Sequence, residues 1–106
     1  MTDVVLVLST VPDDASAETL ARTLVDDKLA ACVNVLAPMV SIYRWKGTVE
    51  QSAERQLIIK TTRALVPALG KRLKELHTYE LPELIVISVA GGANDYLNWV
   101  ESSVRS

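Results

Sequence analysis

The sequence of 106 residues predicts a single α+β domain, in which strand, helix, strand, strand, helix and strand are followed by a last helix. Two kinds of pattern predict these elements. Short runs rich in β-branched residues indicate strands, and aliphatic residues at helical spacing indicate amphipathic helices. Because no repeat, linker or low-complexity tract interrupts them, we expect one domain over residues 1–106.

The first third of the chain predicts a strand followed by a helix. Residues 4–8 are Val-Val-Leu-Val-Leu, an uninterrupted apolar run that is typical of a buried strand. Residues 15–29 then have an apolar face at helical spacing. The positions on that face are Ala17, Leu20, Ala21 and Leu24. The candidate N-caps of this helix are Asp13, Asp14 and Ser16.

A long hairpin is expected in the middle of the chain. Residues 31–45 are extended, with a break at Pro38, which has no N–H to donate to a sheet. Lys46-Gly47 supplies a tight turn, and residues 48–61 return as the next strand. A straight arm of this length would reach about 50 Å, so the arms must bend or project. A bulge near Ser52-Ala53 would allow the bend.

The last elements complete a known topology. A second helix is expected over residues 63–77, with Pro67 in its first turn. Its apolar stripe consists of Leu65, Leu69, Leu73 and Leu76. Residues 84–90 form a strand, and residues 95–104 form a helix that docks through Tyr96 and Trp99. This order is typical of the ferredoxin-like fold, an antiparallel four-stranded sheet with two helices on one face.

The apolar strands also predict an oligomer. One face of a ferredoxin-like sheet lies under the helices, and a sheet with the other face in water should alternate polar and apolar residues. Residues 4–8 and 84–87 do not alternate. A partner subunit would cover the second face, and a projecting hairpin would extend a neighbour's sheet. A bent, monomeric sandwich is the alternative.

Composition argues against several classes of protein. The net charge of −2 and the isoelectric point of about 5.3 argue against a nucleic-acid surface and against a polybasic membrane patch. Cys32 is the only cysteine, which excludes an intrachain disulfide and suits a reducing compartment. The N-terminus lacks a basic signal-peptide region, and no apolar run reaches the roughly 18 residues of a membrane span. We therefore expect a cytoplasmic protein.

Short motifs are spread along nearly the whole chain. They are Ser9-Thr10-x-Pro12-Asp13, Lys28-Leu29-Ala30-Ala31-Cys32-Val33-Asn34, Ser41-x-Tyr43-x-Trp45-Lys46-Gly47-x-x-Glu50, Glu54, Lys60-Thr61, His77-x-Tyr79-x-x-Pro82-Glu83 and Asp95-Tyr96-Leu97-x-Trp99. Their order and spacing resemble the CutA family of divalent-cation tolerance proteins. The resemblance implies a ferredoxin-like homotrimer, akin to PII-type signalling proteins, and copper binding in some members. It implies no defined biochemical activity.

His77 and Cys32 are the candidate metal ligands. His77, the only histidine, is at the end of the second predicted helix, and imidazole commonly binds copper and zinc. Alternatively, His77 is favoured at the helix C-terminus by the helix dipole, and Cys32 is a small buried hydrophobic residue. Met39 is expected to fill a gap in the core or an interface in preference to binding copper. The resemblance implies that copper-binding relatives use a cysteine and two histidines at positions that hold Ser9, Leu76 and His77 here. Any Cu(II) or other divalent cation is therefore expected to bind weakly, and no cofactor is required.

A pocket between subunits is the second candidate site. Glu50, Glu54 and Lys60 have the same parity on the return strand of the hairpin, so they can share a face. Carboxylates in such a group can hold a cation or exchange protons, and a lysine can neutralise an anion. Ion pairs between subunits and a solvated strand face are the alternatives. With the family motifs included, the candidates are Trp45, Glu50, Glu54, Lys60, Tyr79 and Glu83.

Binding is expected in preference to catalysis. Residues 10–14 contain no glycine or arginine, unlike the phosphate-binding loop of acylphosphatase, and Ser9 has no Gly-x-Ser-x-Gly context. Residues 4–8 and 51–61 lack the stacking aromatics of RNA-recognition domains, and an ACT-type domain would accompany a catalytic domain. We expect a cytosolic trimer in the response to divalent metals that binds copper or another small ligand near subunit interfaces. A PII-like signalling or scaffold trimer for protein partners is the alternative.

Overall fold

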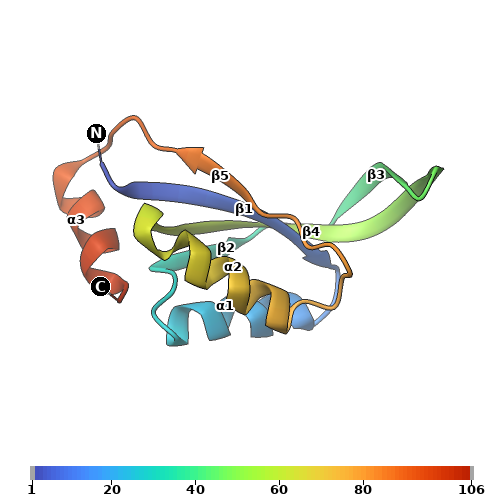
Figure 1. Cartoon of the computed structure of the whole chain (residues 1–106), viewed down its shortest axis with the longest axis horizontal. Coiled ribbons are helices and arrows are strands. Elements are labelled where there is room, and N and C mark those ends of the chain that lie inside the picture. The colour runs from blue at the N-terminus through green and yellow to red at the C-terminus, as the bar shows by residue number, and fades with distance from the viewer. Residues whose placement is uncertain (1, 106) are drawn as a thin grey trace.

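The computed structural model describes residues 2–105 and has a mixed α+β architecture built on one antiparallel sheet (Figure 1). Its strands are β1 (Val4–Pro12), β2 (Cys32–Val35), β3 (Met39–Trp45), β4 (Thr48–Thr62) and β5 (Ile85–Ser88). Its helices are α1 (Ser16–Asp26), α2 (Val66–Leu76) and α3 (Asn94–Ser103), and a short 3-10 helix, η1 (Arg63–Leu65), leads into α2. The order of strands and helices expected from the sequence is confirmed with one correction: the strand expected over residues 31–45 is divided into β2 and β3 around Pro38, so the sheet has five strands and not four.

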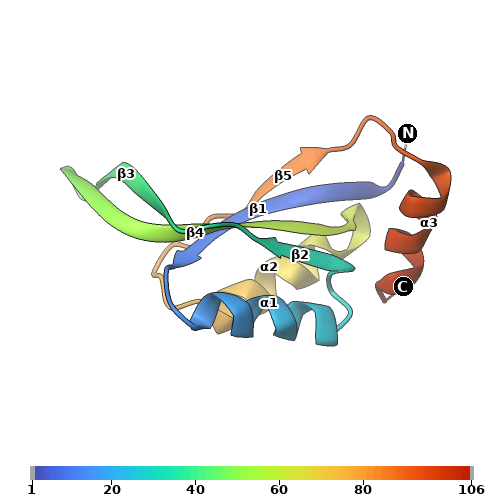
Figure 2. The same ribbon diagram turned by 180° about the vertical axis from the view of Figure 1, so that it is seen from behind.

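The sheet has the strand order β2-β4-β1-β5, and β3 pairs with the outer half of β4. All pairs are antiparallel. The longest ladder that β1 makes joins it to β4, from Val4 opposite Thr62 to Pro12 opposite Glu54. Helices α1 and α2 lie on one side of this sheet, and α3 stands at one end of it (Figures 1 and 2).

The hydrophobic core lies between the sheet and helices α1 and α2. Alternate residues of β1 and β4, such as Val7 and Ile59, are fully buried on this side. The helices contribute the apolar positions expected from the sequence, Ala17, Leu20, Leu24, Leu65, Leu69 and Leu73. The hydroxyl of Thr61 donates a 2.7 Å hydrogen bond to the carbonyl of Leu29, which ties the segment after α1 to β4.

The helix ends differ from the expected boundaries for local reasons. Helix α1 ends at Asp26, three residues early, because Lys28 has a φ of +57° and leaves the right-handed helical region. The predicted N-caps are wrong, because Ala15 holds the N-cap position and makes no capping bond through its side chain. Asp14, one residue earlier, accepts a 2.8 Å hydrogen bond from the Ser16 N–H. The prediction that Tyr96 and Trp99 anchor α3 holds only in part. Each is 45% exposed and Val100 is the fully buried residue of that helix, although the Tyr96 hydroxyl accepts a 3.2 Å hydrogen bond from Lys60 of β4.

The hairpin of β3 and β4 projects from the body, which gives the molecule a longest dimension of 44 Å (Figure 1). Its turn is formed at Lys46 and Gly47, whose φ values are +50° and +81°. The expected bulge near Ser52-Ala53 is wrong, because β4 pairs with β3 without interruption there. The extra residue lies on the opposite strand. Residues 36–38 face only residues 55 and 56 of β4, and Pro38 in this segment has no N–H to donate.

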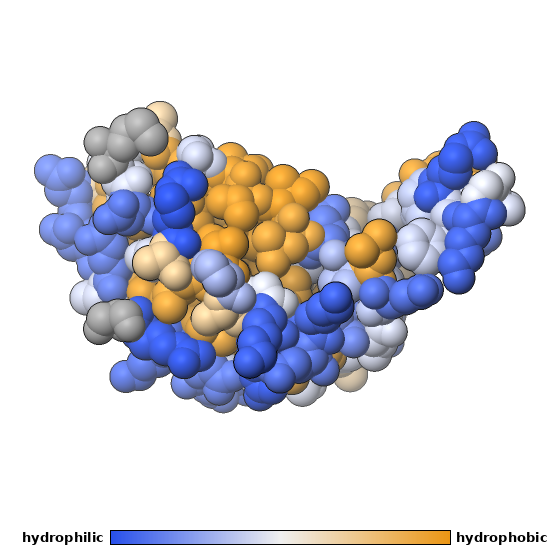
Figure 3. All heavy atoms as spheres, viewed as in Figure 1, coloured by the Kyte–Doolittle hydropathy of each residue, from blue (hydrophilic) through white to orange (hydrophobic). Residues whose placement is uncertain are grey.

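The sheet face opposite α1 and α2 is apolar. Leu6 and Leu8 of β1 point to this side, and their partners on β5, Ile87 and Ile85, are 41% and 50% exposed. Figure 3 shows the resulting hydrophobic surface over β1 and β5. Within residues 2–105, neither α1 nor α2 covers this face (Figure 2). Ile85 and Ile87 are therefore exposed, and Leu6 and Leu8 are only partly buried. No helix in this part of the chain is long and apolar enough to cross a membrane.

Candidate functional site

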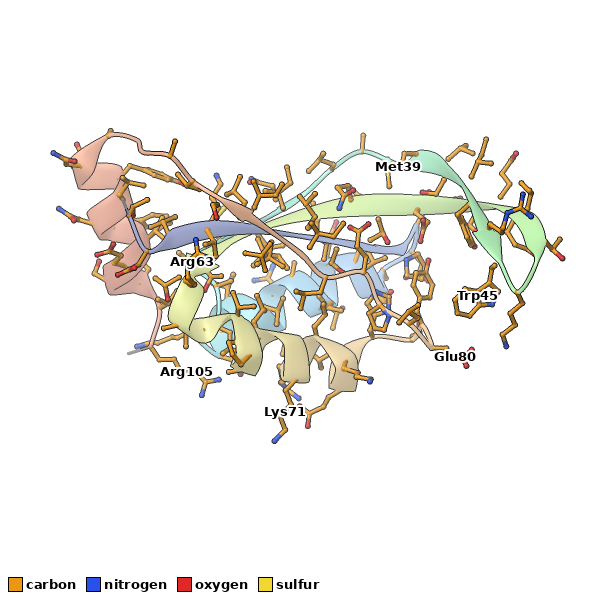
Figure 4. All side chains as sticks on the ribbon, turned by 45° about the horizontal axis from the view of Figure 1, so that its top comes forward. Met39, Trp45, Arg63, Lys71, Glu80 and Arg105 are labelled. Carbon is orange, nitrogen blue, oxygen red and sulfur yellow. The ribbon has the colours of Figure 1, made fainter. Side chains whose placement is uncertain are left out.

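A cavity of about 780 Å³ lies where the hairpin leaves the sheet. The hairpin lines one side with Ser41, Tyr43, Trp45 and Glu54. The connection from α2 to β5, residues 78–84, forms the other side, and Thr10 of β1 lies between them. In Figure 4 the Trp45 side chain extends from the hairpin toward the loop that carries Glu80. The cavity is therefore formed by segments that are distant in sequence.

Glu54 and Tyr79 form the central polar contact of this cavity. The Glu54 side chain is only 6% exposed, and the Tyr79 hydroxyl donates a 2.6 Å hydrogen bond to its Oε2. Burial raises the pKa of Tyr79, and the hydrogen bond to Glu54 and the negative charge of that carboxylate raise it further. Tyr79 therefore remains a protonated hydrogen-bond donor at neutral pH.

His77 holds the loop in place through both of its ring nitrogens. Nε2 donates a 2.7 Å hydrogen bond to the carbonyl of Thr10, and Nδ1 accepts a 3.0 Å bond from the N–H of Tyr79. A carbonyl can only accept, which fixes the proton on Nε2. The imidazole also packs against the Tyr79 ring, at 4.5 Å between centroids. His77 thus positions Tyr79, and a metal ion at either nitrogen would displace one of these bonds.

Cys32, the other candidate metal ligand, lies away from His77. It pairs with Lys60, whereas Thr10, which His77 contacts, pairs with Gln56. Four residues of a strand span about 13 Å. Within residues 2–105, no group of three His, Cys, Asp or Glu residues is placed to hold a metal ion.

Of the two other positions that the resemblance connects with copper, Ser9 lies in the core and Leu76 lies beside it. Ser9 is fully buried, and its hydroxyl has no hydrogen-bond partner among residues 2–105. Leu76 is partly buried and packs against the hydrophobic core. Neither residue is exposed to solvent as a binding surface in this chain.

The structure brings four of the six pocket candidates together. Trp45, Glu54, Tyr79 and Glu83 line the cavity. Glu50 is exposed and lies outside it, nearer the tip of the hairpin. Lys60 is also outside: it lies six residues, or about 20 Å, from Glu54 along β4, and donates a 3.2 Å hydrogen bond to the Tyr96 hydroxyl. The equal parity holds, but it places these residues on one face without bringing them into contact.

Gln56 and Tyr43 are parts of the site that sequence reasoning missed. Gln56 Nε2 donates to the Ser9 carbonyl at 2.7 Å and to Glu83 Oε2 at 3.2 Å, so it ties the loop to the sheet. Its parity on β4, the same as that of Glu54, was the available signal. The Tyr43 hydroxyl forms a 2.8 Å hydrogen bond with Ser52, and its ring lines the cavity.

The cavity is acidic and aromatic. Its lining includes three carboxylates and three large aromatic rings, which are Glu54, Glu80, Glu83, Tyr43, Trp45 and Tyr79. Within residues 2–105 no lysine or arginine lines it. Lys46 lies outside, 3.6 Å from Glu80 and 5.6 Å from the centre of the Trp45 ring. This combination of a buried carboxylate and aromatic walls is suited to binding a ligand.

Comparison with known proteins places the chain in a family. A family model described as CutA1 divalent ion tolerance protein matches residues 5–103. The divalent-cation tolerance protein CutA of Pectobacterium atrosepticum is 46% identical over 103 residues, which cover 97% of this chain and 94% of the relative. The crystal structure of CutA from Xylella fastidiosa is 46% identical, with a TM-score of 0.94 over 98% of this chain and 100% of that one. A structure described as the periplasmic divalent cation tolerance protein CutA from Archaeoglobus fulgidus is 30% identical, with a TM-score of 0.91 over 96% and 99% of the two chains. The chain therefore belongs to the CutA1 divalent ion tolerance family.

Proposed function

We propose that this chain acts in the cellular response to divalent cations as a cytosolic homotrimer of ferredoxin-like protomers. Its ligand site is the cavity beside Glu54, at or near a subunit interface. The observation that carries the proposal is the apolar sheet face formed by Leu6, Leu8, Ile85 and Ile87. Exposed apolar surfaces of this kind mark interaction sites, and the family resemblance supplies the number of copies.

The projecting hairpin supports assembly by a second route. Val40, Ile42 and Val49 are 62%, 69% and 61% exposed on it. Strand β3 pairs only with β4 within residues 2–105, so one edge of β3 carries unpaired backbone groups. An edge strand of this kind is suited to extending the sheet of a neighbouring copy. Such pairing would place the cavity, which the hairpin lines, next to a second subunit.

The proposal includes no catalysis and no resident metal cofactor. Cu(II) or another divalent cation would bind only weakly at His77, because both ring nitrogens already make hydrogen bonds. Breaking one such bond costs about 0.5–1.5 kcal/mol, and one imidazole offers a metal a single ligand. We therefore place the response to metals in the trimer and its cavity, and not in a copper site at His77.

A PII-like signalling or scaffold trimer is the second candidate. It is favoured by Leu81, a cavity-lining residue that is 70% exposed and could contact a protein partner. In this reading the trimer binds other proteins and has no direct role in metal binding.

Growth under metal stress tests the proposed role. A strain without its own family member would express the wild-type chain, Glu54→Gln, His77→Ala or the exposed control Glu50→Gln, at matched levels, in excess Cu(II). We expect the wild type and Glu50→Gln to restore growth and Glu54→Gln to fail. Full rescue by Glu54→Gln would contradict a role for the cavity, and failure of the wild type would contradict a role in tolerance.

Calorimetric titration of the purified protein with Cu(II) and Zn(II) tests whether His77 binds a metal ion only weakly. We expect no site at His77 tighter than about millimolar, which corresponds to about 4 kcal/mol. Tight binding near one metal per chain that is lost in His77→Ala would contradict the proposal and assign His77 as a metal ligand.

A further inference from the structure

We propose that the cavity beside Glu54 binds an organic cation, an amine or guanidinium group that pairs with the Glu54 carboxylate between the rings of Tyr43, Trp45 and Tyr79. This inference specifies that the ligand is positively charged. It rests on the proposed function only because both concern the same cavity. The cation belongs either to a free small molecule or to a lysine or arginine side chain of another copy of this chain.

Glu54 is the anchor of the site. Glu54 is only 6% exposed, and its Oε2 accepts the hydrogen bond from Tyr79. Among residues 2–105, no hydrogen bond or ion pair engages Oε1. Oε1 is not among the fully buried oxygens that lack a partner, so this atom can be reached from the cavity. An ammonium or guanidinium group at Oε1 would donate to it and supply the opposite charge.

The aromatic walls suit an organic cation. Tyr43 and Trp45 come from the hairpin and Tyr79 comes from the loop, so rings face the cavity from two sides. A cation over the face of such a ring is attracted by the ring's negative face. Lys46 already places its ammonium 5.6 Å from the centre of the Trp45 ring, outside the lining. Inside the cavity, the three rings give an organic cation aromatic surfaces to pack against.

The lining suits neither an anion nor a hard divalent metal ion. An anion would meet Glu80 and Glu83 as well as Glu54, and Lys60, the cation expected at this site, instead contacts Tyr96. A hard divalent metal ion requires several oxygen ligands. Three carboxylates line the cavity, but no three such residues among residues 2–105 are placed to hold one metal ion. An organic cation needs only one acceptor, such as Glu54 Oε1, and also fits the aromatic walls.

Trp45 provides a direct reporter. The chain has two tryptophans, and Trp99 on α3 is 45% exposed, so Trp99→Phe leaves Trp45 as the only indole. In this background, Trp45 emission would be followed during titration with n-butylammonium and n-butylguanidinium chlorides at constant ionic strength. The neutral alcohol n-butanol is the matched control, because it has the same carbon chain without the charge.

Two variants separate the carboxylate from the fold around it. We expect a saturable change with both cations, a loss of affinity of about tenfold or more in Glu54→Gln, and no loss in Glu50→Gln, whose side chain lies outside the cavity. Native mass spectra of the same samples distinguish the sources of the cation. If a second copy supplies the basic side chain, Glu54→Gln and excess n-butylammonium each lower the mass of the assembly. If the ligand is a free molecule, the mass does not change.

The proposal is overturned if n-butanol acts as well as the cations, or if Glu54→Gln binds the cations as the wild type does. It is also overturned if neither cation gives a saturable change and Glu54→Gln leaves the mass of the assembly unaltered. A wild-type protein that is monomeric but binds both cations through Glu54 would contradict the proposed trimer and support the cation site. The two proposals can therefore fail separately.

Discussion

Replacing Tyr79 with phenylalanine removes the bond that joins the two sides of the cavity. The substitution deletes one hydroxyl and its 2.6 Å hydrogen bond to Glu54, while the ring can keep its packing against His77. A hydrogen bond to a charged group contributes about 1.5–3 kcal/mol. Because Glu54 is 6% exposed, water replaces the lost donor poorly. We therefore expect the free energy of unfolding to fall by about 2 kcal/mol per chain.

Urea unfolding followed by circular dichroism measures this loss. All samples need one protomer concentration, because the stability of an oligomer depends on concentration. With a slope of about 2 kcal/mol per molar urea, the midpoint should fall by about 1 M. Tyr43→Phe is the matched control: it removes a 2.8 Å bond to Ser52, but Tyr43 is 41% exposed, so we expect a smaller loss, below about 1 kcal/mol.

A double-mutant cycle isolates the contact itself. Glu54→Met removes the carboxylate and keeps a side chain of similar length. If the Tyr79–Glu54 bond is the source of the loss, Tyr79→Phe should cost much less in the Glu54→Met background, with a coupling energy of about 1 kcal/mol or more. Equal costs in both backgrounds, or a Tyr79→Phe variant within about 0.3 kcal/mol of the wild type, would refute this reasoning.

Three other predictions concern single groups. Thr61→Val should lower the free energy of unfolding by about 1–2 kcal/mol in urea titration, because it removes the donor to the buried Leu29 carbonyl. Thr61→Ser keeps the hydroxyl and should retain most of the wild-type stability. Ser9→Ala should raise the thermal midpoint by removing a buried hydroxyl that lacks a partner among residues 2–105, and a lower midpoint would contradict that assignment. The pKa of Tyr79 is raised above 10.0, so its contribution to stability is complete below about pH 10 and is lost as the pH rises through the folded value. The difference in tyrosinate absorbance between the wild type and Tyr79→Phe should therefore titrate above pH 10, and a midpoint at or below 10 would contradict this.

The order of strands and helices could be predicted from the sequence because each element has a strong local pattern. The differences arise where geometry depends on partners. The end of α1 could not be predicted from residue type, because it depends on the positive φ of Lys28, which is uncommon for a lysine. The extra residue at 36–38 is a matter of register, which depends on how β2 and β3 each pair with β4.

Most residues of the candidate site could be predicted from the sequence, but their contacts with one another could not. Strand parity placed Glu54 and Lys60 on one face, but parity carries no information about distance along the strand. The contact between Glu54 and Tyr79 depends on where the loop after α2 crosses the sheet, which His77 fixes through the Thr10 carbonyl. The family motifs contained these residues, but no local pattern linked them. The exposed aromatic pair of α3 was misassigned in part, because helical spacing alone does not tell a buried face from an exposed one.

The central claim is that other copies of this chain cover the apolar sheet face. Native mass spectrometry of the tag-free protein at low micromolar concentration tests it, with Ile87→Lys as the variant because Ile87 is 41% exposed on that face. We expect a wild-type mass of about three times 11.6 kDa and a much larger monomer fraction for the variant. A wild-type protein that has the mass of one chain, 11.6 kDa, would contradict it.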